Sequence, residues 1–285
     1  MKKKLIIVIS GVAVVAVAVA LFFLLRGNKD SYRIIKIFEF TGTATVTREN
    51  IGDITPYNNM LLESGDNIFL ETGTMTIKMD EDKYAYVDEN TRFSIKAEGT
   101  AENSRTTIEV TSGAITNEIQ NKLGGESSYE VNTPNSTMAV RGTVFRAEVY
   151  YDENGICYTK ISVFDGKVET RLLYPDGTVS EEETVIEAGK EVIIYQDDQV
   201  TDYLTEVTDI DYSALPDGVK ELIHNILGTE GPFTVTFMYN GAVFGTQTVK
   251  KGECASAPSL APSLNGDWDF DFSTAITEDT VIYWK

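Results

Sequence analysis

Short hydrophobic runs alternate with polar and turn-forming residues from about Ile37 to Tyr195, and no stretch there keeps a helical period. The runs are rich in β-branched and aromatic side chains, as at residues 43–47, 107–110 and 144–150. This spacing is typical of half-buried strands. We therefore predict an all-β domain over residues 37–195, folded as a meander or a rolled sandwich.

The second half of this domain has the pattern of consecutive antiparallel hairpins. Asn154-Gly155, Asp165-Gly166 and Asp176-Gly177 each separate two strand-like runs. Glycine after Asn or Asp supplies the positive φ that tight hairpin turns require. We therefore expect a hairpin at each of these dipeptides.

The β pattern stops over residues 196–231. An acidic stretch precedes an amphipathic segment, about 214–227, whose apolar residues recur at helical spacing. Ser213 can cap this helix, Pro216 suits its first turn, and Gly228 ends it. The sequence predicts an acidic linker whose one helix packs on a sheet between two domains.

Residues 232–285 have the pattern of a second, smaller β module. A strand-like run over 233–239 turns at Asn240-Gly241 and returns over 243–249, and a last strand-like run ends the chain at 281–284. The turn dipeptide again favours a hairpin.

The run from Leu5 to Leu25 contains no charged residue. As a helix it would be about 31 Å long, close to the thickness of the hydrocarbon core of a bilayer. We predict a single transmembrane helix over residues 5–25 and a linker over 26–36. A cleavable signal peptide is the alternative, although its apolar region is usually only ~7–15 residues long.

Charge sets the expected orientation of this helix. Lys2, Lys3 and Lys4 precede it, and a long acidic chain follows it. The positive-inside rule places residues 1–4 in the cytoplasm as a short tail and the later domains outside. We predict a single-pass protein of the cell membrane with an extracytoplasmic ectodomain.

The ectodomain is strongly acidic. The chain has 24 basic and 44 acidic residues, and five of the bases but none of the acids lie in the first 29 positions, which leaves a formal charge of −25 for the rest. Such a charge repels nucleic acid, so we expect no nucleic-acid partner, and it disfavours anionic lipid head groups as well.

Residues 131–145 read VNTPNSTMAVRGTVF, and three other segments accompany them: GTATV at 42–46, MLLESGDNI at 60–68 and VFDGKV at 163–168. Together these segments resemble the FecR domain family over about residues 36–195. The resemblance implies a β-rich domain outside the inner membrane, found in regulators that relay ferric-citrate uptake signals to a sigma factor through a cytoplasmic N-terminal region. Residues 1–4 are too short for such a region, so we expect no direct anti-sigma activity. The signature residues, expected to be structural, are Thr133, Pro134, Val140, Arg141, Gly142, Thr143, Phe145 and Gly166.

The C-terminal module has a resemblance of its own. Its segments VTF at 235–237, TQTV at 246–249, NGDWDF at 265–270 and IYW at 282–284 resemble a degenerate internalin B-type (Listeria-Bacteroides) repeat, a small β-grasp-like unit of bacterial surface proteins. The resemblance implies display at a cell surface and contact with protein or glycan, without catalysis.

Arg141 is the most informative polar residue of the signature, because a guanidinium in an apolar strand needs a carboxylate or carbonyl partner. One interpretation is a contact to an anion or a partner. The other, which we favour at this stage, is a fork that ties the Thr133-Pro134 turn to the sheet, with Gly142 allowing close approach.

No set of residues in the sequence predicts a catalytic, cofactor or metal site. His224 is the only histidine and is expected to face solvent from the helix. Asp267, Asp269 and Asp271 alternate, but the segment lacks the glycine and the terminal glutamate of a calcium loop, so we expect a solvated strand face. Cys157 and Cys254 are too few for a disulfide framework, and whether they pair stays open.

These observations predict a fold that is mainly β, with a FecR-like domain and a small β-grasp-like module behind one membrane helix. They favour a non-enzymatic, membrane-anchored, extracytoplasmic binding or regulatory protein, without a cytoplasmic anti-sigma region, whose partner is an extracytoplasmic protein or glycan. A structural cell-surface or adhesion protein is the alternative, and an enzyme with an unrecognised site is a third.

Overall fold

The computed structural model describes residues 33–100, 102–196, 204–228, 232–250, 252–258 and 266–285. The predicted cytoplasmic tail and transmembrane helix, and most of the linker that follows, lie outside the described residues. Among the helices that are described, none is long and apolar enough to cross a membrane.

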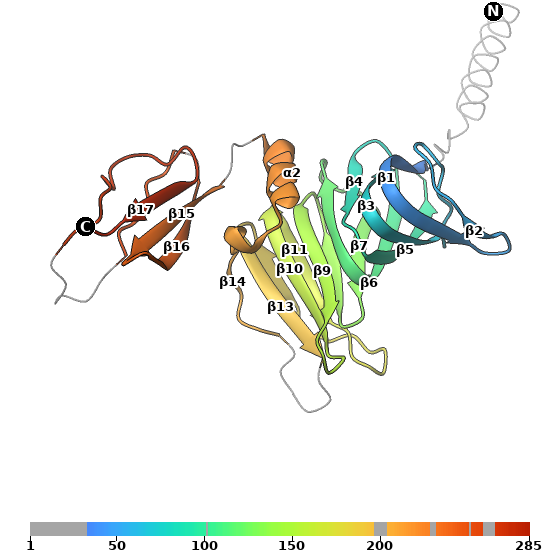
Figure 1. The fold of residues 1–285 in the computed structure, drawn as a ribbon. Coiled ribbons are helices and arrows are strands. Elements are labelled where there is room, and N and C mark those ends of the chain that lie inside the picture. Colours follow the sequence, from blue (N-terminus) through green and yellow to red (C-terminus); the bar gives the residue numbers. More distant parts are fainter. Residues whose placement is uncertain (1–32, 101, 197–203, 229–231, 251, 259–265) are drawn as a thin grey trace, which may run out of the picture.

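The protein is mainly β, as predicted, with one α-helix, α2 (Asp217–Leu227), among its described elements (Figure 1). The first six strands are β1 (Ile35–Arg48), β2 (Gly52–Ile54), β3 (Asn67–Met79), β4 (Lys83–Val87), β5 (Thr91–Gly99) and β6 (Ser104–Ile119). The next eight are β7 (Ser128–Thr133), β8 (Ser136–Val140), β9 (Val144–Tyr151), β10 (Cys157–Asp165), β11 (Lys167–Leu172), β12 (Thr184–Glu187), β13 (Lys190–Gln196) and β14 (Thr208–Asp209).

Two layers share the long strand β6. Its first half pairs with β5 and, in parallel, with β7, and the sheet continues through β8 and β11 to β12. Its second half pairs with β4 and β9, and this sheet continues through β10 and β13 to β14. The domain is therefore a rolled sandwich, one of the two arrangements that we predicted.

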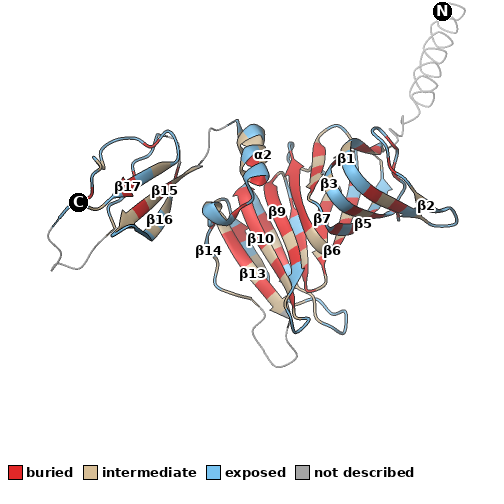
Figure 2. Ribbon diagram, viewed as in Figure 1, coloured by how far each residue is buried: buried red, intermediate tan, exposed pale blue. Residues whose placement is uncertain are grey.

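One hydrophobic core fills the space between the two layers. Ile108 on β6 and Val131 on β7 contribute from the first layer, and Phe145 on β9 and Ile161 on β10 from the second; all four are fully buried. Buried and more exposed residues alternate along β7 and the first half of β6 because successive side chains point to opposite faces, whereas the second half of β6 and most of β9 are buried throughout (Figure 2).

A buried amide joins the layers at the turn between β7 and β8. Asn135 Nδ2 donates to the carbonyls of Cys157 (3.1 Å) and Ile194 (3.3 Å) on the opposite layer. The Thr159 hydroxyl donates to Asn135 Oδ1 (2.6 Å) and lies 2.9 Å from the Thr133 hydroxyl. The Thr133-Pro134 turn is thus tied to the second layer, and the side chain that ties it is Asn135.

The chain crosses between the layers at Asp165-Gly166, so this dipeptide is not the hairpin turn that we expected. β10 pairs with β9 and β13, whereas β11, which follows directly, pairs with β8 and β12. A positive φ at glycine serves a sharp corner between sheets as well as a hairpin, so the dipeptide alone could not distinguish them. The other two predicted turns do connect antiparallel strands, β9 with β10 and β11 with β12.

Helix α2 covers one end of the second layer. Val219 and Ile223 pack against Val144 of β9 and Phe164 of β10, which confirms the predicted packing of one helix face on a sheet. Gly228 ends the helix with φ 60°, as expected. The predicted Ser213 cap is wrong, because Ser213 lies in a preceding 3₁₀ turn, Tyr212–Ala214, and the helix begins after Pro216.

The predicted acidic linker is partly strand. β14 pairs with β13, and Leu204 bridges Ile194, so residues from this segment complete the second layer. The β domain therefore extends beyond residue 195, where we placed its end.

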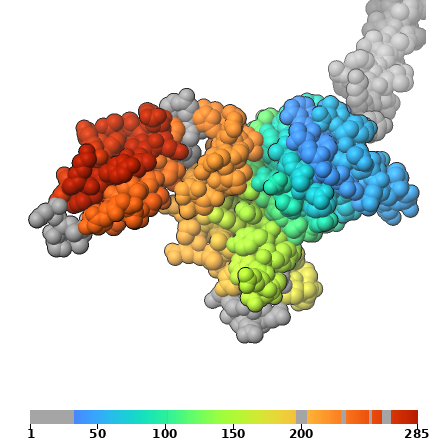
Figure 3. All heavy atoms as spheres, in the orientation of Figure 1, coloured from blue at the N-terminus to red at the C-terminus, as the bar shows by residue number. Residues whose placement is uncertain are grey.

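The C-terminal module is a three-stranded sheet with a core of its own. β15 (Pro232–Tyr239) pairs antiparallel with β16 (Ala242–Lys250) and parallel with β17 (Thr280–Tyr283). Trp268 packs edge-on against Phe237 and Trp284, with ring centroids 5.2 and 5.3 Å away. In Figures 1 and 3 this module and the first strands occupy opposite ends of the molecule.

We expect Asn135→Ala to destabilise the β domain by about 3 kcal/mol, because the carbonyls of Cys157 and Ile194 would lose their shared donor while still buried. Asn154→Ala, in the exposed turn between β9 and β10, is the matched control and should change stability by less than about 0.5 kcal/mol. Urea denaturation followed by circular dichroism measures both. Equal effects of the two substitutions would show that Asn135 does not join the layers.

Candidate functional site

Three segments of chain cross between the layers at one end of the domain. They are the bend between β8 and β9 at residues 141–143, the corner at Gly166, and the turn before β13 at Gly189. A Cβ atom on Gly166 would lie 2.7 Å from the Gly142 carbonyl oxygen, and the backbone N–H of Gly189 donates to the Val163 carbonyl (2.8 Å). The crossings therefore lie side by side.

Most of the signature residues lie at this end of the fold. Val140 and Phe145 are buried in the core, and the buried hydroxyl of Thr143 donates to the Lys167 carbonyl (3.0 Å). Gly142 (φ 80°) and Gly166 (φ 76°) have backbone conformations that other residues rarely adopt, in places where a side chain would collide with backbone. With Thr133 in the Asn135 network, these positions support the expected structural role.

Arg141 is the exception, and our preferred interpretation of it is wrong. It lies in the exposed bend and not in a strand, and it makes no hydrogen bond or ion pair with any residue that the structure describes. The buried guanidinium of this region belongs to Arg146, five residues later. Its Nη2 lies 2.7 Å from Asp88 Oδ2, and its Nε lies 3.7 Å from Glu148 Oε2. The signature alone did not reveal which of the two arginines is inside.

A shallow hollow of about 240 Å³ adjoins Arg141. Lys167 and Glu169 of β11 also line it and form an ion pair at 2.7 Å, and the hydrogen bond from Lys167 to Glu169 raises the pKa of the lysine. The remaining residues of the wall are Ser127, Ser128, Tyr129, Ala139 and Val140. Its polar side chains can bind a carboxylate or a hydroxyl-rich group.

Lys122 lies beside this bend, since a Cβ atom on Gly142 would lie 3.1 Å from the Lys122 Cα. Like Arg141, it is exposed and pairs with no carboxylate among the described residues. Two unpaired cations and the paired Lys167 therefore gather on a protein whose formal charge is −20. Sequence reasoning missed Lys122 because the loop that carries it has no motif; the contact with Gly142 is purely tertiary.

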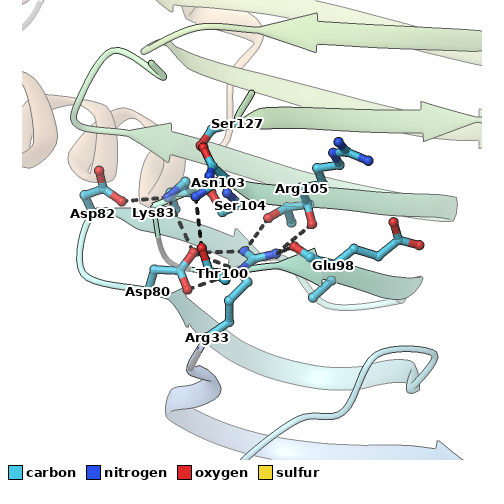
Figure 4. A network of polar contacts seen from close by, with 12 residues as sticks. Arg33, Asp80, Asp82, Lys83, Glu98, Thr100, Asn103, Ser104, Arg105 and Ser127 are labelled. Carbon is cyan, nitrogen blue, oxygen red and sulfur yellow. Dashed lines mark hydrogen bonds and ion pairs between the residues drawn. The ribbon is translucent and has the colours of Figure 1, made fainter. Parts of the chain in front are cut away.

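A second polar cluster begins at the first described residue, Arg33 (Figure 4). Its guanidinium lies 2.9 Å from Asp80 Oδ2 and donates to the carbonyls of Glu98 (3.1 Å) and Arg105 (2.6 Å). Lys83 is buried next to it and pairs with Asp80 (3.5 Å) and Asp82 (2.8 Å). These charges are paired with one another, so the cluster fixes the start of β1 rather than offering a binding site.

Asp82 connects this cluster to the loop that carries Lys122. Burial would raise the pKa of Asp82, but hydrogen bonds from Lys83 and from Asn121 Nδ2 (3.1 Å) outweigh it and lower the pKa below its ordinary value. The backbone N–H of Gln120 also donates to the Asp82 carbonyl (3.0 Å).

We expected His224 to face solvent, but it does not. It is half-buried and lines a hollow of about 220 Å³ between α2 and the C-terminal module, with Phe233, Thr234 and Asp279. Tyr212 lines the same hollow, and burial raises the pKa of its phenol to about 12.

Each of the three alternating aspartates accepts a hydrogen bond from a backbone N–H group of the C-terminal module. Asp267 accepts from the N–H of Trp268, Asp269 from Tyr283 and Asp271 from Ser273. The segment is a loop, apart from an isolated bridge between Trp268 and Trp284, so the expected strand face is wrong. Within the described ranges, no three His, Cys, Asp or Glu side chains are grouped to hold a metal ion. Cys157 is buried, Cys254 is exposed, and both are free thiols.

We expect Asp82→Asn to flatten the loss of stability in acid. Because folding lowers the pKa of Asp82 below the unfolded value of about 3.9, its charged form stabilises the fold above about pH 4, and that contribution is lost as the pH falls further. Melting temperatures between about pH 3 and pH 6 measure this slope. Glu81→Gln removes an exposed carboxylate from the same turn and controls for net charge; a wild-type slope in Asp82→Asn would contradict the assignment.

The family described as FecR protein matches residues 68–169, from β3 to β11. The match includes the Asn135 turn, the Arg141 bend and the Gly166 corner, but it covers only about a third of the chain. No curated protein matches. Two crystal structures of a proposed anti-sigma factor from Parabacteroides distasonis ATCC 8503 align with this chain at 14% identity, with TM-scores of 0.40 and 0.41. The alignments cover 77% and 76% of this chain, and 98% and 97% of the anti-sigma factor chains. TM-scores below 0.5 do not establish a shared fold, so the similarity to FecR proteins rests on the family match over residues 68–169.

Proposed function

We propose that this chain is a non-enzymatic, membrane-anchored, extracytoplasmic binding or regulatory protein, and that the FecR-like domain holds its partner at the Arg141 bend. The observation that carries the proposal is the position of Arg141: it is exposed and unpaired, in a bend whose neighbours are fixed by buried contacts. A rigid bend that presents an arginine loses little conformational entropy when it binds a carboxylate.

The charge around the bend indicates the chemistry of the partner. Arg141 and Lys122 have no acidic partner among the described side chains, whereas the formal charge of the whole chain is −20. A carboxylate-bearing protein segment or acidic glycan suits this site, and nucleic acid is disfavoured by the charge of the rest of the ectodomain.

The C-terminal module supports a second candidate, a structural or adhesion protein of the cell surface. One face of its sheet covers the Trp268 core, while Val243, Val281 and Tyr283 on the other face are each at least 50% exposed. An internalin B-type repeat would use such a module for display and contact at the surface.

We expect Arg141→Met to weaken capture of the partner at least about fivefold, which corresponds to about 1 kcal/mol. Stability should change by less than about 0.5 kcal/mol, because the exposed guanidinium has no contact to lose. Crosslinking in intact membranes, followed by affinity purification of the full chain and mass spectrometry, measures the captured partner. Arg171→Met, on the exposed face of β11, is the matched control.

Two results would overturn this proposal. Wild-type chain that captures no specific protein or glycan would exclude the binding role, and equal capture by Arg141→Met would exclude the bend. Capture that depends on Val281 and Tyr283 but not on Arg141 would favour the adhesion alternative.

A further inference from the structure

An apolar patch lies at the start of β1, next to the ion pair between Arg33 and Asp80. Ile35 and Ile37 point into the core and are at most 6% exposed, whereas Ile34 and Phe38 point outward and are 51% and 38% exposed. Leu61, 61% exposed, lies opposite Lys36 on the neighbouring segment. We define the β1 patch as Ile34, Lys36, Phe38 and Leu61.

The segment that carries Leu61 is held firmly, so this exposure is built into the fold. The N–H of Ile37 donates to the Met60 carbonyl and the N–H of Leu62 to the Ile35 carbonyl, both at 2.9 Å. Met60 and Leu62 are buried in the core. Arg48 donates to the Leu61 carbonyl (3.1 Å) from an ion pair with Asp66.

The patch is basic as well as apolar. Lys36 Nζ lies 5.2 Å from the centroid of the Phe38 ring and 2.8 Å from Asn59 Oδ1, and no carboxylate in the described part of the chain pairs with it. Lys78 is the neighbour of Lys36 on β3, and its amino group lies 5.6 Å from the centroid of the Tyr84 ring. Aliphatic, aromatic and lysine side chains together are the composition of surfaces that lie in the interface of a bilayer.

We propose that the β1 patch rests on the lipid bilayer and orients the β domain on it. The inference depends on the predicted transmembrane helix over residues 5–25. Only eight residues separate Leu25 from Ile34, so the patch lies at most about 32 Å along the chain from the end of that helix. The ion pair between Arg33 and Asp80 holds the chain immediately before β1, so the position of the anchor directly affects that of β1 (Figure 4).

The large negative charge of the ectodomain does not prevent this contact. At physiological ionic strength, charges more than about 8 Å apart are largely screened in solvent, so the bilayer responds mainly to the charges nearest to it. The charges beside the patch are Lys36, Lys78, Glu39, Glu63 and Glu81. Glu81 pairs with Lys78 at 3.5 Å and Glu63 with Arg48 at 2.6 Å, so Glu39 is the carboxylate that remains next to Phe38 without a cation partner among the described residues.

The test uses the full chain, one copy in each nanodisc of phosphatidylcholine and phosphatidylglycerol, with a nitroxide at Leu61→Cys in a Cys157→Ala, Cys254→Ser background. Val185→Cys, an exposed valine on β12 at the other end of the sheet order, is the matched control. We expect the nitroxide at 61 to be severalfold less accessible to an aqueous nickel chelate than the one at 185, and more accessible to oxygen. Lys36→Glu should reduce this difference.

Equal accessibility at the two positions would overturn the proposal. Shielding at 61 that appears only when discs hold two copies would instead show self-association, which also overturns it. Retention of the chain in membranes after alkaline extraction tests the anchor separately, and capture of a partner at Arg141 is independent of both readouts.

Discussion

The sandwich depends on one constraint: polar groups buried between its two layers must stay paired, both where the chain crosses between the layers and where the layers face each other. Three such passages lie together at one end of the domain, and the Asn135 amide spans the layers where the turn between β7 and β8 meets β10 and β13. An unpaired buried carbonyl costs on the order of 1–3 kcal/mol, which is a large share of the stability of a typical domain. The polar residues in the middle of the signature are therefore structural even though their chemistry resembles that of a binding site.

The corner at Gly142 and Gly166 also explains why Arg141, in the same segment, is exposed. The two glycines bring three backbones close together, so no large side chain can fill the corner from inside. Thr143 satisfies the Lys167 carbonyl within it, and Arg141 lies outside on the exposed bend, with no carboxylate partner among the described residues. The structure gives Arg141 a fixed position without giving it a partner, which is the arrangement that a recognition residue needs.

Much of the fold could be predicted because its signals are local. Alternation of side chains predicted the strands, and apolar spacing with Gly228 predicted helix α2. The layer crossings could not be predicted, because Asp165-Gly166 has the same local conformation in a corner as in a hairpin. The interpretation of Arg141 as a guanidinium inside a strand was wrong, because the buried guanidinium is that of Arg146 and its burial depends on Asp88, which is 58 residues away in the sequence. The position of Lys122 and the β1 patch could not be predicted either. Both depend on contacts between segments that are far apart in the sequence, and the spacing of hydrophobic residues does not reveal such contacts.

The two polar clusters are connected through the fold, and this connection limits where a partner can lie. Arg33 pairs with Asp80, Lys83 links Asp80 to Asp82, and Asp82 accepts from Asn121. Lys122 follows Asn121 and touches Gly142, next to Arg141. A continuous chain of contacts therefore connects the first described residue to the Arg141 bend. If residues 5–25 span the bilayer, the length of this chain of contacts limits how far from the membrane a partner at Arg141 can lie. A more distant partner would first meet the C-terminal module, which lies at the other end of the molecule from β1.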